Sequence, residues 1–290
     1  YSYSIPIVIC TGQVSTALIG NDAFQEVDIV GITRPCTKHN FLVKDVKDLA
    51  ETVRKAFYLA RSGRPGPVLV DIPKNIQQAS CEFVWPEDVV MRSYCPTFRA
   101  NLNQLRRAMD VLVTSRKPLI VAGGGVIMAN AAEELCTLAH LMHAPVCSTL
   151  MGLGAFPGDD PLWIGMLGMH GTFAANRAVT QADVILAVGA RFDDRVTGKL
   201  SQFAPNARIV HIDIDPTTLR KNVRVEVPVV SDALSALQGL RSILESGHAQ
   251  KDWAGDHADW MGQVLEWQKE HPLSWAKGDV LKPQQVVARM

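Results

Sequence analysis

The sequence lacks an excess of charge of either sign and lacks a long apolar run. Its 29 Lys and Arg residues balance 29 Asp and Glu residues, so the net charge does not favour a nucleic-acid or membrane-surface partner. No apolar run reaches the roughly 20 residues that a membrane span needs. The first residues, Tyr-Ser-Tyr-Ser, carry neither a basic segment nor an initiator Met, and they resemble neither a signal peptide nor a natural start. We therefore expect the chain to begin inside a larger protein.

The six cysteines are scattered and form no Cys-x-x-Cys motif. We expect no His at ligand spacing, no zinc site and no disulfide framework, and we assign no metal ligands. Cys10 and Cys147 lie in strand-like runs and are predicted to be buried. A reducing compartment is the simplest setting for such cysteines, which predicts a cytoplasmic protein.

Short β-branched runs alternate with helical patterns, which is typical of an α/β fold with parallel sheets and helices on both faces. The predicted strands are residues 5–10, 67–72, 118–122, 145–150, 183–188 and 208–214, and the predicted helices are residues 46–60, 101–113, 131–142 and 232–244. Residues 76–100 hold two Pro residues and no sustained period, which predicts a linker between two domains.

Three of the predicted strands end in glycine-rich or polar loops, at Gly123, Gly189 and Asp213. In open parallel sheets ligands bind at the carboxyl ends of strands, so these loops predict a nucleotide site at one edge. The glycines at 123–125 would let the backbone approach a phosphate closely, with free N–H groups in the helix that follows. The alternative is that they only make a tight turn between a strand and a helix.

Charged side chains follow the same strands. Residues 191–195 hold two Arg and two Asp, which either pair with each other or bind a charged ligand, and Arg suits phosphate. The carboxylates at the end of strand 208–214 could accept a hydrogen bond from a ribose hydroxyl. Alternatively, Asp215 caps a helix that begins at Pro216. His170 is either a ligand contact or a helix cap.

Lys74 follows the predicted strand 67–72 of the first domain. A lysine at the carboxyl end of a strand could be a catalytic or anion-binding group. The alternative is a solvated surface lysine, which is the commoner state of this residue.

These segments, in this order and spacing, resemble the large catalytic subunit of acetolactate synthase (acetohydroxyacid synthase), a thiamine-diphosphate-dependent enzyme. The resemblance covers essentially the whole chain and is carried by motifs at residues 11–14, 20–26, 37–40, 63–74, 149–154, 167–172, 191–199 and 211–215. It implies four parts. Residues 1–75 would be the back part of a pyrimidine-binding domain, 76–100 a linker, 101–246 a complete FAD-binding domain, and 247–290 a helical linker toward a diphosphate-binding domain.

The resemblance implies that pyruvate is decarboxylated on thiamine diphosphate and joined to pyruvate or 2-oxobutyrate, in the synthesis of valine, leucine and isoleucine. This chain would bind FAD, whereas thiamine diphosphate and Mg²⁺ would be held mostly by residues outside it. The enzyme would be a homodimer or tetramer with a small regulatory subunit, and it would bind neither nucleic acid nor membrane. Residues 1–290 contain neither the family's activating glutamate nor its Gly-Asp-Gly motif, so we expect the chain alone to be inactive.

Residue by residue, the resemblance implies that Gln25 and Phe24 lie near the thiamine and the second substrate, and that Lys74 lies at the mouth of the channel. The residues that would form the FAD cradle are Arg64, Gly123, Gly124, Gly125, Thr149, Leu150, Met151, Leu167, Gly168, Met169, His170, Gly189, Arg191, Asp193, Arg195, Val196, Asp213, Ile214 and Asp232. Ser15 departs from the family, where many relatives have Pro. Two alternatives stay open: a pyruvate oxidase-like enzyme with redox-active FAD, and a non-catalytic flavin-binding module.

Overall fold

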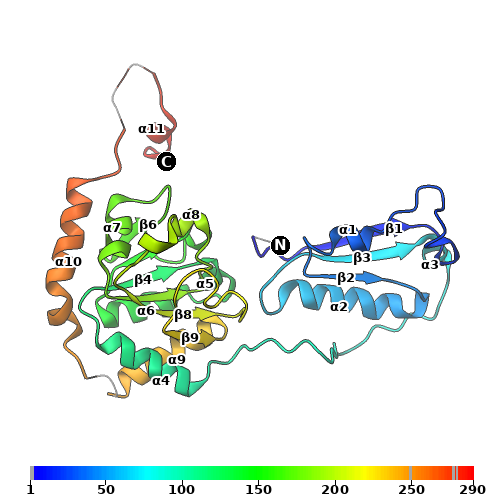
Figure 1. The fold of residues 1–290 in the computed structure, drawn as a ribbon, viewed down its shortest axis with the longest axis horizontal. Helices are drawn as coiled ribbons and strands as arrows, with labels where there is room; N and C mark the ends of the chain where they lie inside the picture. The colour runs from blue at the N-terminus through cyan, green and yellow to red at the C-terminus, as the bar shows by residue number, and fades with distance from the viewer. Residues whose placement is uncertain (1–2, 248–249, 276–277, 279) are drawn as a thin grey trace. The chain divides into compact units, whose positions relative to one another are not determined.

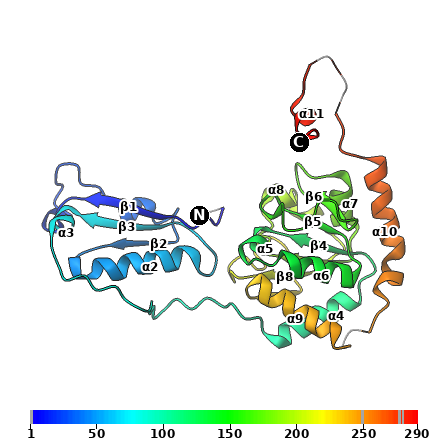
Figure 2. The same cartoon turned by 180° about the vertical axis from the view of Figure 1, so that it is seen from behind.

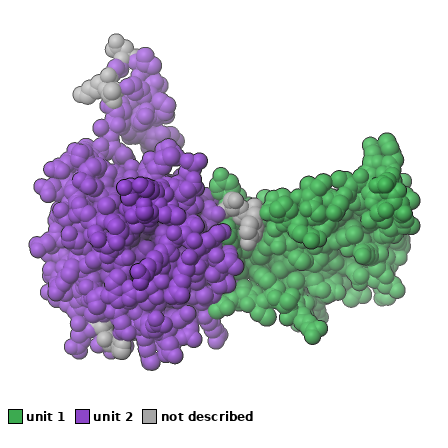
Figure 3. Space-filling view, viewed as in Figure 1, with its two compact units in different colours: residues 1–97 green, residues 98–290 purple. Residues whose placement is uncertain are grey.

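The computed structural model describes residues 3–247, 250–275, 278 and 280–290, and the chain divides into two compact units. Unit 1 comprises residues 1–97 and unit 2 comprises residues 98–290 (Figure 1; Figure 3). Each unit contains one parallel sheet packed against helices, which confirms the predicted class of parallel-sheet α/β domains.

Unit 1 is built on a three-stranded parallel sheet of order β1-β3-β2. Its elements are β1 (Val8–Gln13), η1 (Thr16–Leu18), α1 (Ile29–Thr33), β2 (His39–Leu42), η2 (Val46–Asp48), α2 (Leu49–Arg61), β3 (Val68–Pro73) and α3 (Lys74–Gln78). Val68 and Val70 of the central strand pack with Ala56 and Leu59 of α2 in one buried cluster. Cys10 is exposed, so its predicted burial is wrong. The reason is that β1 is an edge strand, which in the described part of the chain pairs with β3 alone.

Residues 79–101, all of which the structure describes, form no helix or strand. Part of this segment nevertheless packs on unit 1. The Tyr94 hydroxyl donates to the carbonyl oxygen of Ser62 at 2.7 Å and accepts from Lys38 Nζ at 2.8 Å. Further along, the N–H of Ala100 donates to Ser235 Oγ at 3.1 Å within unit 2.

Unit 2 is built on a six-stranded parallel sheet of order β6-β5-β4-β7-β8-β9. Its strands are β4 (Pro118–Ala122), β5 (Val146–Ser148), β6 (Trp163–Met166), β7 (Val184–Val188), β8 (Arg208–Asp213) and β9 (Val227–Val230). Its helices are α4 (Leu102–Val113), α5 (Gly124–Met128), α6 (Ala132–Met142), η3 (Leu150–Gly152), α7 (Phe173–Gln181), α8 (Asp194–Thr197), η4 (Leu200–Gln202), α9 (Ala233–Glu245), α10 (Trp253–Glu270) and α11 (Pro283–Val287).

Helices cover both faces of this sheet. Alternate residues of each buried strand point to opposite faces, so each strand contributes side chains to two cores. Ile120 and Ala122 of β4 belong to a core that contains side chains of α4, α6 and α9. Leu119 and Val121 belong to a second core with side chains of α7 and α10. Figure 2 shows α4, α6 and α9 together, with α10 along the side of the unit. The central strands are therefore apolar at every position, which is why the sequence predicts β4 and β7 well.

The long helix α10 is anchored on the amino edge of this sheet. Trp260 Nε1 donates to the carbonyl oxygen of Pro118 at 2.8 Å, and the buried His257 places Nδ1 2.8 Å from the carbonyl oxygen of Met142. Burial and the nearby Lys251 lower the pKa of His257. Despite its length, α10 is amphipathic, and in the part of the chain that the structure describes no helix is apolar and long enough to cross a membrane.

Candidate functional site

The candidate site lies where the sheet of unit 2 reverses its strand order. The chain starts in the middle of the sheet at β4, adds β5 and β6 on one side, and then adds β7, β8 and β9 on the other. This is the order 3-2-1-4-5-6 of dinucleotide-binding folds, in which the ligand binds outside the carboxyl ends of the strands at the reversal. The loops at Gly123, Gly189 and Asp213 follow β4, β7 and β8, which are neighbours, so they share one edge as predicted.

At the reversal, glycines bring the loops after β4 and β7 into backbone contact. A Cβ atom on Gly123 would lie 2.0 Å from the carbonyl oxygen of Gly189, and a Cβ atom on Gly189 would lie 2.5 Å from Gly125 Cα. Gly189 also has a φ of +60°, which favours glycine. The N–H groups of Gly123 and Gly125 donate to Val188 and Gly189 at 2.8 and 3.2 Å, so these two amides serve the tight turn.

The loop after β5 packs beside these glycines. The N–H of Thr149 donates to the carbonyl oxygen of Ala122 at 3.0 Å, which ties this loop to the end of β4. A Cβ atom on Gly124 would lie 3.0 Å from Met151 Cβ. Leu150 is 67% exposed and Met151 is 39% exposed. The loop therefore presents apolar surface at the carboxyl edge of the sheet.

Two buried polar atoms near this edge have no hydrogen-bond partner among the described residues. One is the Oγ of Ser148, the last residue of β5, and the other is Nδ1 of His211 in β8. His211 Nε2 lies 2.7 Å from the carbonyl oxygen of Ala190, and burial lowers the pKa of His211 to about 4. An unsatisfied buried hydroxyl is destabilising, and it is one of the features expected beside a ligand site.

The loop after β6 meets the helix α8. The N–H of Met169 donates to the carbonyl oxygen of Arg195 at 2.9 Å, and a Cβ atom on Gly168 would lie 2.4 Å from that same oxygen. Leu167 is buried beneath this contact, whereas Met169 is 61% exposed. The loop after β6 and helix α8 are thus held together through their backbones, and the side chain of Met169 faces solvent.

His170 is exposed in the turn before α7 and does not cap that helix. The cap is Thr172, whose Oγ1 accepts from the N–H of Ala175 at 3.2 Å. The interpretation of His170 as a helix cap is therefore wrong. Asn176 is a residue that sequence reasoning missed, and its side-chain amide exchanges two hydrogen bonds with the backbone of Gly168, at 2.9 and 3.0 Å. Asn176 therefore fixes the loop that carries His170.

The charged residues after β7 are only partly neutralised. Asp193 caps α8 by accepting from the N–H groups of Arg195 and Val196 at 3.2 and 3.3 Å. Arg191 Nη2 lies 3.4 Å from Asp193 Oδ2, and Arg195 Nε lies 3.8 Å from Asp194 Oδ2. The Arg195 side chain is 72% exposed, and Val196 packs against the core. Exposed ion pairs of this kind are weak, so both guanidinium groups can still bind an anion.

The end of β8 carries two buried carboxylates. Asp213 Oδ1 accepts from the N–H of Asp215 at 2.8 Å, and Asp215 Oδ1 accepts from the N–H of Thr217 at 3.0 Å. Residues 216–220 form turns, so the predicted helix at Pro216 is wrong, and Asp215 stabilises a turn instead. At the end of β9, Asp232 caps α9. Ile214 is half-buried between the two buried carboxylates.

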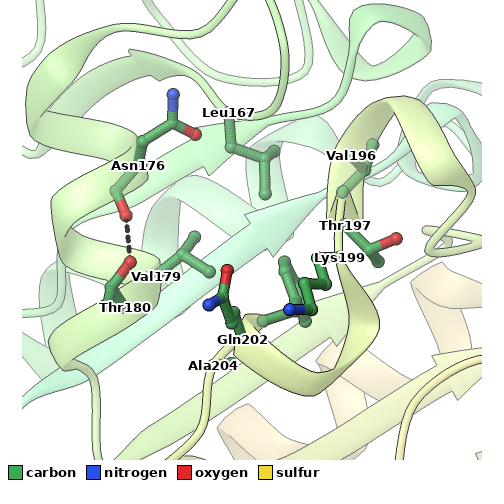
Figure 4. Close-up of a pocket in the computed structure, with 10 residues that line it drawn as sticks. Leu167, Asn176, Val179, Thr180, Val196, Thr197, Lys199, Gln202 and Ala204 are labelled. Carbon is green, nitrogen blue, oxygen red and sulfur yellow. Dashed lines mark hydrogen bonds between the residues drawn. The ribbon is translucent and has the colours of Figure 1, made fainter.

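A cavity of about 190 Å³ lies beside this edge (Figure 4). It shares Leu167 and Val196 with the loops described above, and Lys199 is the one cation among its lining residues. The other lining residues are Asn176, Val179, Thr180, Thr197, Gln202, Phe203 and Ala204. In Figure 4 Thr180 Oγ1 donates to the carbonyl oxygen of Asn176 at 2.9 Å.

The remaining predicted residues belong to unit 1. Gln25 lies in the loop after β1 with a φ of +61°, and its neighbour Phe24 is 89% exposed. Lys74 is exposed at the start of α3, directly after β3. Because β1 and β3 are parallel neighbours, both loops leave the same edge of the sheet. Arg64 is also in unit 1, where its Nε donates to Ser4 Oγ at 3.0 Å.

Three hydrogen bonds organise this edge of unit 1. The N–H of Thr16 donates to Asn75 Oδ1 at 2.9 Å, which joins the loop after β1 to α3. Glu26 accepts from the N–H groups of Gly20 and Ala23, and these bonds lower the pKa of Glu26. Glu26, the residue after Gln25, therefore closes this loop through hydrogen bonds to the loop's own backbone.

Comparison with known proteins identifies the class of this fold. Residues 105–240 match the family described as "Thiamine pyrophosphate enzyme, central domain". Residues 105–240 of unit 2 are therefore similar to the central domain of thiamine pyrophosphate enzymes.

The curated relatives give a narrower similarity, to acetolactate synthase large subunits. The chain is 47% identical over 292 residues to the acetolactate synthase isozyme 3 large subunit of Escherichia coli (strain K12), which covers 99% of this chain and 50% of that protein. It is 45% identical to the probable acetolactate synthase large subunit of Methanocaldococcus jannaschii, over 99% of this chain and 48% of that protein. The chain is thus a homologue of acetolactate synthase large subunits, which confirms the resemblance. It spans about half the length of these curated relatives.

Proposed function

We propose that this chain is part of the catalytic subunit of an acetolactate synthase. The enzyme would decarboxylate pyruvate and join the remaining two-carbon unit to a second 2-oxo acid, either pyruvate or 2-oxobutyrate. The products, acetolactate and acetohydroxybutyrate, lead to valine, leucine and isoleucine. The observation that carries this proposal is the 47% identity to the Escherichia coli large subunit across 99% of the chain.

Within this function, unit 2 would bind FAD at the carboxyl edge of its sheet. Three features of this edge suit such a ligand: backbone without side chains at Gly123 and Gly189, exposed apolar surface at Leu150 and Met169, and the guanidinium group of Arg191. FAD combines a pyrophosphate with large aromatic rings, so it can use all three. Arg suits the phosphates because it forms charge-assisted, bidentate hydrogen bonds.

Side chains around these features would complete the cradle. Asp213 and Asp232 offer carboxylates at the ends of β8 and β9, where a ribose or adenine needs a hydrogen-bond acceptor. The unsatisfied Oγ of Ser148 is a further polar group at this edge. The other residues that we assign to the cradle are Gly124, Gly125, Thr149, Met151, Leu167, Gly168, His170, Asp193, Arg195, Val196 and Ile214.

Unit 1 would serve the substrates. Thiamine diphosphate, when bound with Mg²⁺, supplies the carbanion chemistry of this reaction, and the protein positions the reactants. The exposed amine of Lys74 would attract the carboxylate of a 2-oxo acid, and Gln25 and Phe24 would orient the second substrate. Since β1 and β3 are neighbours, these three residues can act on one substrate.

The assembly is part of the same proposal. The relatives are named large subunits, which suggests a small regulatory subunit as a partner. We propose that the catalytic subunits form a homodimer or tetramer in the cytoplasm.

The test is an activity assay on the complete subunit that contains these residues. We expect it to form acetolactate from pyruvate when thiamine diphosphate, Mg²⁺ and FAD are present, and to form none when thiamine diphosphate is omitted. Oxygen uptake with pyruvate but without acetolactate would instead identify a pyruvate oxidase. Flavin binding without any condensation would identify a non-catalytic flavin-binding module.

A further inference from the structure

A second group of chemically active side chains lies at the opposite edge of the unit 2 sheet. Cys136 and His140 are four residues apart on α6, so both lie on one face of that helix. Asp160 lies three residues before β6 and faces them. Their three ligand atoms, one thiol sulfur, one ring nitrogen and one carboxylate oxygen, all lie within 4.8 Å of one another. The expectation that no His lies at ligand spacing is therefore wrong.

The arrangement of these atoms is close to that of a zinc site. His140 Nε2 lies 2.7 Å from Asp160 Oδ2. Around tetrahedral zinc, with bonds of roughly 2.0–2.3 Å, ligand atoms are roughly 3.3–3.8 Å apart. The His and Asp atoms must therefore move apart by roughly 0.6–0.9 Å, and the sulfur must approach by at most roughly 1.5 Å, and side-chain rotation allows both shifts.

The carboxylate is already oriented for this role. Asp160 Oδ1 accepts from the N–H of Leu162 at 2.9 Å, which leaves Oδ2 directed at His140. Hydrogen bonds of this kind fix the first ligands of metal sites. The Asp160 side chain is 12% exposed and the His140 side chain is 50% exposed, so one side of the cluster is open to solvent. Water can supply a fourth ligand from that side.

We propose that Cys136, His140 and Asp160 bind a zinc ion with water as the fourth ligand. A thiolate, an imidazole and a carboxylate together favour zinc over Mg²⁺ and Ca²⁺, which take oxygen ligands. The site is separate from the proposed FAD site, because Asp160 precedes the amino end of β6 whereas the FAD residues follow the carboxyl ends. The proposal therefore does not rest on the proposed function.

The consequence of zinc binding would be to fasten an edge strand. Among the residues that the structure describes, β6 pairs only with β5, and the register between them shifts between Val146 and Ser148. A zinc ion shared by α6 and Asp160 would hold the start of β6 against the neighbouring helix. The far end of β6 leads directly to Leu167, so zinc would also steady the loop that carries His170.

The experiment is a Co²⁺ titration of the reduced 290-residue chain, with Co²⁺ as the visible probe and Zn²⁺ as the competitor. We expect one equivalent of Co²⁺ to bind with a thiolate charge-transfer band and tetrahedral visible bands, and Zn²⁺ to abolish both. Saturating Zn²⁺ should raise the melting temperature of unit 2 by roughly 5 °C or more. Cys136→Ser should lose the charge-transfer band, and His140→Gln should lose the tight equivalent.

Asp160→Asn separates a loss of metal binding from a loss of fold, because the amide oxygen of Asn can still accept from the N–H of Leu162. This variant should keep the metal-free melting temperature of the wild type and lose at least tenfold in Co²⁺ affinity. Cys95→Ser removes an exposed cysteine from unit 1 and should bind as the wild type does. The proposal is overturned if the wild type shows no tetrahedral Co²⁺ spectrum, or if Cys136→Ser and Asp160→Asn bind the metal as the wild type does.

Discussion

Gly123 and Gly189 lie in backbone contact where β4 and β7 end, so that a Cβ atom on Gly123 would lie 2.0 Å from the carbonyl oxygen of Gly189. The contact joins the two loops between which the strand order reverses. It is reinforced by the hydrogen bond from the N–H of Gly125 to Gly189 at 3.2 Å. The position of the proposed FAD site thus depends on two residues that have no side chain.

The first prediction concerns this contact. Gly189→Ala should destabilise unit 2 by about 1–3 kcal/mol, because its φ of +60° disfavours Ala and the new Cβ would lie 2.5 Å from Gly125 Cα. Urea unfolding of unit 2 measures this change. The matched control is Gly262→Ala, an exposed glycine in α10 whose added Cβ would meet no atom within 4 Å, so that Ala should be neutral or stabilising there. Equal stability of the two variants would contradict the tight contact.

The second prediction concerns the cations at the same edge. Arg191→Ala should weaken FAD binding by roughly 1.5–3 kcal/mol, the scale of a hydrogen bond to a charged group. The measurement is a titration that follows quenching of flavin fluorescence. Arg208→Ala is the control, because Arg208 lies at the amino end of β8 and pairs with Glu226 at 2.6 Å. A chain that takes up no flavin, or an Arg191→Ala variant that binds as tightly as Arg208→Ala, would count against the FAD site.

Much of the sheet could be predicted because its central strands are buried on both faces. β4 and β7 are apolar at every position and stand out as uninterrupted runs. The sequence patterns do not predict β2, β6 and β9. Each of these strands has only four residues, and they contain His39 and Asn40 in β2, Gly165 in β6 and Pro228 in β9. These residues are poor strand formers, and the strands exist because a neighbouring strand pairs with them. Pairing between distant segments is not visible in local patterns.

The candidate sites divide in the same way. The loops at Gly123, Gly189 and Asp213 could be predicted to meet, because parallel strands place their carboxyl ends at one edge. The proximity of Cys136 and Asp160 could not be predicted. The two residues are 24 positions apart in the sequence (160 against 136), and only a loop of the folded chain brings the aspartate to the helix. The spacing of Cys136 and His140 was the one signal of a metal site in the sequence. It indicates such a site specifically only when the third ligand, Asp160, is known.

The third prediction concerns pH. His211 is buried with a pKa of about 4, whereas a histidine in the unfolded chain has a pKa near 6.5, so the unfolded chain binds more protons between these values. The stabilisation by neutral His211 is complete above pH 6.5 and is lost as the pH falls toward 4. At about 1.4 kcal/mol per tenfold change, the loss reaches about 3 kcal/mol.

Urea unfolding of unit 2 from pH 7.5 to pH 4 measures this loss. His211→Gln has no group that titrates at this position, so its stability should fall by about 3 kcal/mol less than that of the wild type over the same range. His257, whose pKa is also lowered by burial, titrates in both proteins and cancels in the comparison. Parallel pH profiles for the two proteins would show that His211 is not the buried neutral group described above.

The last prediction concerns unit 1 and rests on the proposed function. Gln25→Ala and Lys74→Ala, made in the complete subunit, should each lower the turnover of pyruvate to acetolactate by roughly tenfold or more, because a misplaced substrate reacts slowly. FAD affinity and melting temperature should stay at the wild-type values, because Lys74 and Gln25 are exposed and contribute little to the core. The matched control is Lys47→Ala, another exposed lysine of unit 1, which should leave turnover unchanged. A Lys74→Ala enzyme with normal turnover would remove Lys74 from the site, and a parallel loss of melting temperature and turnover would assign Gln25, with its φ of +61°, to the fold instead.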